Sequence, residues 1–141
     1  MRNTSRLSIV FATVLLPAAS LAAGTQSFDG VWLTTLSCPA AQDAPAYSHQ
    51  FKSTVKGGVL YGVFGTVGEA SSLELGGSIA PDGTAKLFVK GRTGSTEPDE
   101  PDAPRGSPYS YSVDANFAAK SGTGTRLESR PCTLQFAKQK K

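Results

Sequence analysis

The stretch that decides the fold is FDGVWLTTLSC, residues 28–38, which holds the only tryptophan of the chain and one of its two cysteines. Polar and apolar side chains alternate along it, and this period of two predicts a β-strand. The predicted inner face carries Trp32, Thr34, Leu36 and Cys38. The second cysteine, Cys132, stands in RPCTLQF near the far end of the chain. A bond between the two cysteines would fasten the first strand of the fold to the last.

The first 23 residues have the composition of a secretory signal peptide. Two arginines precede an apolar run over residues 7–16, and small neutral residues follow it. This pattern predicts cleavage after Ala22 or Ala23 and a periplasmic or secreted protein. The apolar run is shorter than the about 20 residues that a membrane-spanning helix needs, and an N-terminal helical anchor is the alternative. We expect residues 24–141 to form one domain without a membrane span.

The charge balance of the mature chain gives no indication of a polyanionic partner. The full chain has 14 basic and 11 acidic residues, and loss of the two leader arginines lowers the net charge from +3 to +1. A domain so close to neutrality is not drawn by its net charge to nucleic acid or to a charged membrane surface. We therefore expect no nucleic-acid partner.

The two cysteines predict a single structural disulfide. A lone pair of cysteines in an exported chain is expected to be oxidised. A reactive thiol pair is the alternative, but Cys38 and Cys132 lack the short C-x-x-C spacing of redox motifs. A bridge that closes so long a loop stabilises a fold by about 4–5 kcal/mol in the chain-entropy model.

Short alternating segments separated by glycine-rich turns follow one another along the mature chain, and none has the period of an amphipathic helix. They predict eight strands, at residues 28–38, 47–55, 59–65, 72–79, 85–90, 109–117, 125–130 and 132–137. Lys56-Gly57-Gly58 and Pro81-Asp82-Gly83 are predicted tight turns. A further turn is predicted at residues 120–124.

Eight consecutive strands with short connections predict an all-β fold, an eight-stranded up-and-down antiparallel barrel. Antiparallel neighbours would bring the end of the first strand, at Cys38, beside the start of the last, at Cys132. Closure also removes the unpaired edges of an open sheet. An immunoglobulin-type sandwich is the alternative, but it would place a tryptophan between its cysteines, whereas Trp32 precedes both.

The head of the first strand, Gly30-Val31-Trp32, is similar to the Gly-x-Trp start of lipocalins and related small barrels. The resemblance implies a lipocalin- or avidin-like barrel. It also implies that an arginine from a late strand packs across the tryptophan, and Arg126 and Arg130 are the candidates.

The mature chain as a whole resembles a group of small exported proteobacterial proteins that have one disulfide and no assigned function. The resemblance is carried by Gly30-x-Trp32 followed by Cys38, Gly76-Gly77 followed by Pro81-Asp82-Gly83, Tyr109-Ser110-Tyr111, and Arg130-Pro131-Cys132. It implies a location, periplasmic or secreted, and no chemistry. Periplasmic metalloprotease inhibitors of the one-disulfide barrel type share the size and the architecture.

Aromatic residues with inward parity form either a packed core or the lining of a pocket, because eight-stranded barrels have room for filling side chains or for one small ligand. The set comprises Trp32, Tyr47, Phe51, Tyr109, Tyr111 and Phe117. His49, the only histidine, also faces inward, as a polar anchor for a ligand or as a hydrogen-bonded residue near the barrel mouth. The candidate ligand-binding residues are Trp32, His49, Phe51, Tyr109 and Tyr111.

Catalytic and metal sites find no support in the sequence. A single histidine excludes a multi-histidine zinc site, and neither a Ser-His-acid set nor a carboxylate pair stands out. The long acidic loop, residues 93–107, has oxygen ligands for calcium, but its spacing matches no EF-hand and a solvated loop is the alternative. We expect no enzyme activity, no metal and no cofactor.

Two functions from different classes follow from these residues. The first is a barrel that binds a small apolar or aromatic ligand, which the inward aromatic set and His49 suggest. The second is a protein-interaction module, such as an inhibitor of an exported hydrolase, which would use the acidic loop or the outward residues Leu33 and Phe88.

Overall fold

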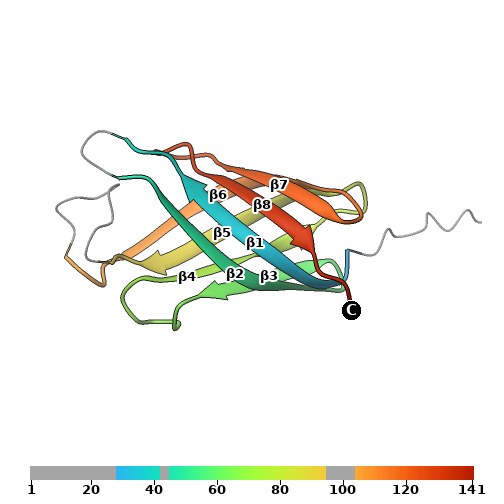
Figure 1. Cartoon of the computed structure of the whole chain (residues 1–141), viewed down its shortest axis with the longest axis horizontal. Helices are drawn as coiled ribbons and strands as arrows, with labels where there is room; N and C mark the ends of the chain where they lie inside the picture. Colours follow the sequence, from blue (N-terminus) through green and yellow to red (C-terminus); the bar gives the residue numbers. More distant parts are fainter. Residues whose placement is uncertain (1–27, 42–44, 95–103) are drawn as a thin grey trace, which may run out of the picture.

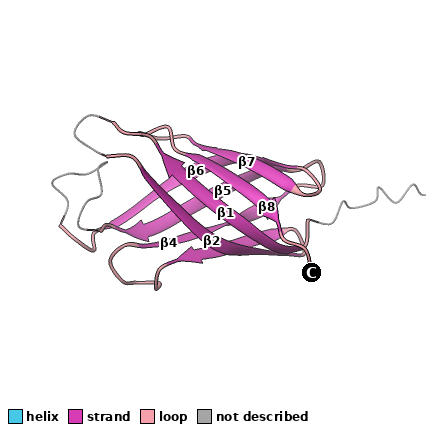
Figure 2. Ribbon diagram, viewed as in Figure 1, coloured by secondary structure: helices cyan, strands magenta, loops and turns pink. Residues whose placement is uncertain are grey.

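The computed structural model describes residues 28–41, 45–94 and 104–141, which form one closed antiparallel barrel (Figures 1 and 2). Each strand pairs with its neighbours in sequence, and β8 pairs with β1. The strands are β1 (Gly30–Cys38), β2 (Tyr47–Lys56), β3 (Val59–Phe64), β4 (Ser72–Ile79), β5 (Thr84–Arg92), β6 (Pro108–Phe117), β7 (Ser121–Arg126) and β8 (Thr133–Lys138). The predicted up-and-down barrel is confirmed, and the two-sheet sandwich is wrong.

The two ends of the barrel differ. The turns after β2, β4 and β6 and the C-terminus lie at one end, which we call the hairpin end (at the right in Figure 1). The connections after β1, β3, β5 and β7 emerge at the other end, which we call the disulfide end. The predicted signal peptide falls outside the described residues.

The disulfide joins Cys38, the last residue of β1, to Cys132, which directly precedes β8, with an S–S distance of 2.07 Å. The ladder between the two strands pairs Ser37 with Thr133, so the cysteines stand next to each other at the end of that ladder. Both cysteines are buried. The predicted tie between first and last strands is confirmed, and it is consistent with an oxidising compartment outside the cytoplasm.

Asp29, at the head of the fold-deciding stretch, anchors the turn between β2 and β3. Its carboxylate accepts hydrogen bonds from the N–H groups of Gly57 and Gly58, at 3.0 and 3.2 Å. These two bonds lower the pKa of Asp29 below its ordinary value. Both glycines have positive φ, 58° and 75°, as a two-residue hairpin turn requires. The residue directly before β1 thus stabilises the turn of the β2–β3 hairpin.

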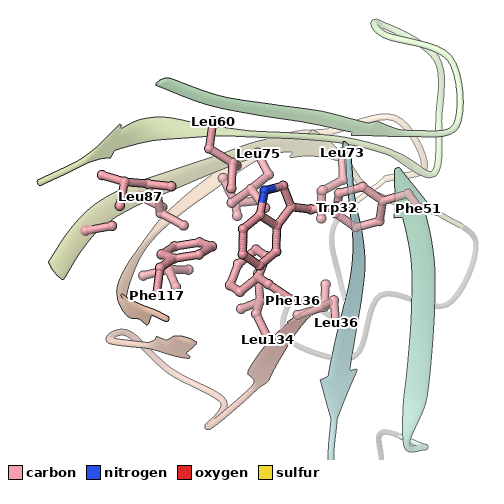
Figure 3. Packing of buried hydrophobic residues seen from close by; sticks show 14 of the residues in the cluster. Trp32, Leu36, Phe51, Leu60, Leu73, Leu75, Leu87, Phe117, Leu134 and Phe136 are labelled. Carbon is pink, nitrogen blue, oxygen red and sulfur yellow. The ribbon is translucent and has the colours of Figure 1, made fainter. Parts of the chain in front are cut away.

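Trp32 lies at the centre of the core with none of its surface exposed (Figure 3). Its indole N–H donates a 2.8 Å hydrogen bond to the carbonyl of Phe28, and its ring meets Phe117 edge-on at 5.5 Å. Phe117 in turn packs against Phe136 at 4.7 Å. The surrounding space is filled by Leu36, Leu60, Leu73, Leu75, Leu87, Leu134 and Val55. Side chains therefore fill the lumen around Trp32, which was one of the two alternatives for the aromatic interior.

The expectation that an arginine packs across the tryptophan is wrong. The cation over the Trp32 ring is Lys138, whose Nζ lies 5.7 Å from the ring centroid. Arg126 and Arg130 lie instead over Tyr111 and Tyr47. Lys138 ends β8 beside Trp32 in the β1–β8 ladder, whereas both arginines belong to the disulfide end.

The seventh strand is displaced from its predicted position. It runs from Ser121 to Arg126, and the predicted turn at residues 120–124 and strand at 125–130 are both wrong. Gly122 and Gly124 are buried on the inner face of β7. A Cβ on Gly122 would lie 2.8 Å from the Phe117 ring, and a Cβ on Gly124 would lie 2.9 Å from Val113. These glycines make room for larger side chains, which a rule that assigns glycine to turns does not detect.

A pair of hydroxyl groups is buried within the apolar core. The Thr34 and Ser53 oxygens lie 2.7 Å apart, and the two residues are 0% and 1% exposed. Gly62 on β3 faces the same interior, because a Cβ there would lie 2.2 Å from the Ser53 oxygen. The inner face of β3 thus carries Leu60, Gly62 and Phe64.

The double variant Cys38→Ala/Cys132→Ala is expected to lose about 2–5 kcal/mol of unfolding free energy, the usual cost of losing the disulfide of a small domain. The strand content should persist below the melting temperature, because the β1–β8 ladder remains. Thermal and urea denaturation followed by circular dichroism measure both quantities. Equal stability of parent and variant under oxidising conditions would contradict the assigned role of the bridge.

Thr34→Val is expected to cost about 1–3 kcal/mol, because the Ser53 hydroxyl is then buried without its hydrogen-bond partner. Thr34→Val/Ser53→Ala should recover part of that loss, since both polar groups are then removed together. Urea unfolding of the parent, Thr34→Val, Ser53→Ala and the double variant gives the coupling free energy between the two side chains. Losses that simply add in the double variant would show that the pair is not coupled.

Candidate functional site

A cleft of about 780 Å³ opens at the disulfide end of the barrel. Inward-facing positions of the strands contribute Tyr47 of β2, Tyr109 and Tyr111 of β6, and Arg126 of β7 to its lining. Its rim is completed by charged and small polar residues, among them Glu74, Lys90, Arg92, Ser110 and Glu128. The cleft therefore has aromatic walls and a polar rim, as small-molecule sites commonly do.

Three of these side chains form a stack. The rings of Tyr109 and Tyr111 lie 6.2 Å apart and are nearly parallel, with an interplanar angle of 7°. The guanidinium of Arg126 lies over the Tyr111 ring, 4.1 Å from its centroid. Tyr111 is only 6% exposed, whereas Tyr109 and Arg126 are partly exposed. The buried Tyr111 thus stands between two partly exposed side chains of the cleft.

Arg130 holds the other side of the disulfide end together. It is almost completely buried, at 4% exposure, and donates hydrogen bonds to the carbonyls of Pro39 and Pro45. Its guanidinium also lies over the ring of Tyr47, 5.3 Å from the centroid. The Arg130 side chain thus links the segment before β8 to both ends of the β1–β2 connection, and it packs against Tyr47.

The base of the long connection between β5 and β6 is closed by Thr93, which is 3% exposed. Its hydroxyl donates to the carbonyl of Pro104 at 2.8 Å and accepts from the N–H of Ser107 at 3.0 Å. The backbone groups of Thr93 bond to those of Gly106 and Ser107 as well. The two ends of the connection are therefore held together at the cleft rim. The acids of the loop at residues 93–107, which could supply oxygen ligands for calcium, are Glu97, Asp99, Glu100 and Asp102, and all four lie outside the described residues.

His49 lies near the barrel mouth but does not line the cleft. Its imidazole stacks on Phe64, with ring centroids 4.1 Å apart at 21°, and lies 5.1 Å from the ring of Tyr47. Burial lowers the pKa of His49 from its ordinary value, because the charged form loses hydration. The residue is a half-buried member of the aromatic layer between the core and the opening.

The five candidate ligand-binding residues divide between the core and the cleft. Trp32 and Phe51 are buried in the core, and His49 lies above them without lining the cleft. Tyr109 and Tyr111 do line it. The structure thus brings two of the five to the cleft.

Sequence reasoning left Tyr47 and Arg126 out of the candidate site. Arg126 was one of the two arginines expected over Trp32, and it lies over Tyr111 instead. The register between β6 and β7, which pairs Arg126 with Val113, decides which ring it contacts.

The part of the chain that the structure describes holds no group of three or more His, Cys, Asp or Glu side chains that could bind a metal ion. Within the same residues, no helix has both the length and the apolar character needed to cross a membrane.

Comparison of the chain with protein-family models, with curated proteins and with solved structures finds no match. The fold and its disulfide therefore stand on the geometry of this chain. The findings support a closed eight-stranded antiparallel barrel with one disulfide and identify no family.

The free energy of unfolding is expected to decrease as the pH falls below about 6.5, the ordinary pKa of a histidine in an unfolded chain. Because the pKa of His49 is lowered in the native state, the unfolded chain binds the proton better, so protonation favours unfolding. Above that pH the contribution is fully present. His49→Phe keeps an aromatic ring against Phe64 and should remove this part of the pH dependence.

Urea midpoints of parent and His49→Phe at pH 7.5 and 5.5 measure the effect. If the urea midpoint of the parent fell no more than that of His49→Phe between pH 7.5 and 5.5, His49 would not be the source of the pH dependence.

Proposed function

We propose that this protein binds a small ligand with an aromatic or apolar body in the cleft at the disulfide end, outside the cytoplasm. The observation that carries the proposal is the 780 Å³ cleft walled by Tyr47, Tyr109 and Tyr111. Its volume lies within the range of about 300–1,000 Å³ that is usual for ligand pockets. Flat rings on paired strands present large contact surfaces that lose little conformational freedom when a ligand binds.

The packed core limits where such a ligand can bind. Trp32, Phe117 and Phe136 fill the lumen toward the hairpin end, and each large apolar side chain buried there contributes roughly 1.5–3 kcal/mol to stability. Opening a deep cavity would sacrifice these contributions. The ligand therefore rests on the aromatic layer at the mouth.

A protein-interaction module is the second candidate, and the outer face of the barrel favours it. Tyr61 and Phe88 are 51% and 48% exposed and flank Gly76 on adjacent strands. Phe88 leans over that glycine, since a Cβ on Gly76 would lie 3.1 Å from its ring. Val59 is also exposed on β3 and Val31 on β1, whereas Leu33 is half-buried. Exposed apolar neighbours of this kind are typical of contact surfaces between proteins.

Binding of the neutral fluorescent probe N-phenyl-1-naphthylamine tests the ligand proposal. Tyr109→Ser is expected to raise its Kd about three- to tenfold, because an aromatic contact of about 0.5–1.5 kcal/mol is lost. Tyr61→Ser is the matched control, since Tyr61 is exposed on the outer face and does not line the cleft. It should leave the Kd unchanged.

Fluorescence titration of folded parent and variants, checked by circular dichroism, gives the three constants. Absence of probe binding to the parent, or equal weakening by both substitutions, would overturn the proposed site.

A further inference from the structure

We infer that the cleft selects ligands that carry an anionic group beside their aromatic body, and that Arg126 receives this group. The anion is a carboxylate, sulfonate or phosphate joined to a ring system. This inference rests on the proposed function, because it names the class of ligand that the same cleft takes.

The position of Arg126 is the first reason. Its guanidinium covers the face of Tyr111, 4.1 Å from the ring centroid, and lines the cleft. A guanidinium that stacks on a ring contacts it with its flat face, while its N–H groups point outward in the guanidinium plane. That geometry suits an anion at the edge of the ring and an aromatic body beside Tyr109, in one continuous stack.

The second reason is the distribution of charge around the cleft. Lys90, Arg92 and Arg126 line it, with the Lys90 Nζ over Phe88 on the outer face, and the Arg130 guanidinium lies over the ring of Tyr47. The described lining also holds two acids, Glu74 and Glu128, so its three cations exceed its acids by one charge. Glu128 accepts from the backbone N–H of Ser112 at 2.9 Å, and Glu74 accepts from the hydroxyl of Tyr61 at 3.0 Å.

The tyrosine walls therefore face cations from two sides, over Tyr111 and over Tyr47. Partly buried charges are screened less than exposed ones, so their combined potential favours an anion within the cleft. The acidic side chains between Ser95 and Ala103 lie outside the described residues. Binding of a charged probe to the full chain includes their contribution to the electrostatic potential.

Two probes with the same skeleton isolate the anionic contribution. 1-Anilinonaphthalene-8-sulfonate differs from N-phenyl-1-naphthylamine by one sulfonate group. Arg126→Gln is expected to raise the Kd of the sulfonate probe about tenfold, which corresponds to about 1.4 kcal/mol, and to change that of the neutral probe less than twofold. Arg126→Lys should restore part of the loss, since it keeps the charge without the planar fork.

Arg105→Gln is the matched control, because it removes one positive charge from an exposed residue at the same end that does not line the cleft. It should leave both constants within twofold. The affinity of the parent for the sulfonate probe should also fall with added salt more steeply than that of Arg126→Gln. 1-Naphthoate should displace the bound sulfonate probe, whereas acetate at the same concentration should not.

The outcomes separate this inference from the proposed function. Equal loss of both probes in a folded Arg126→Gln would assign Arg126 a packing role and overturn the inference alone. If Arg105→Gln weakened binding of the sulfonate probe as much as Arg126→Gln does, the effect would reflect net charge alone, and the inference would be overturned. Displacement by acetate would show that the aromatic body is not required. Neutral-probe binding that is absent, or that does not depend on Tyr109, would overturn the proposed function itself.

Discussion

The pairing of β1 with β8 is the constraint on which the rest of the structure depends. Without this ladder, the first and last strands would present two unpaired edges, which invite association with other chains. The ladder ends at Ser37 and Thr133, and the disulfide follows directly. Closure therefore combines backbone hydrogen bonds with one covalent link. It also encloses the interior that Trp32 and its neighbours fill.

Closure gives the two halves of the interior different roles. Toward the hairpin end, apolar side chains pack around Trp32, and the hydroxyls of Thr34 and Ser53 satisfy each other. At the disulfide end the strands carry tyrosines, and two arginines lie over them. Such rings tolerate partial exposure, because they combine an apolar face with a polar tip. The rim can therefore contact a ligand without disturbing the packed half.

The largest difference between the predicted and the observed strands lies in β7, and it has a packing cause. Gly122 and Gly124 stand where a Cβ would collide with Phe117 and Val113 of β6. Within a single sequence, such glycines cannot be distinguished from turn glycines, because the colliding side chains belong to another strand. Arg126, one of the two arginines expected over Trp32, lies over Tyr111 in the observed register.

Three features could be predicted from the amino-acid pattern: the number of strands, the inner faces of β1, β2 and β6, and the pairing of Cys38 with Cys132. These follow from a side-chain period of two, turn residues of known conformation and the presence of only two cysteines. Which aromatic residues fill the lumen and which line the cleft follows from the folded barrel and not from the pattern. That division depends on cross-strand register and on the size of neighbouring side chains, and both involve residues far apart in the chain.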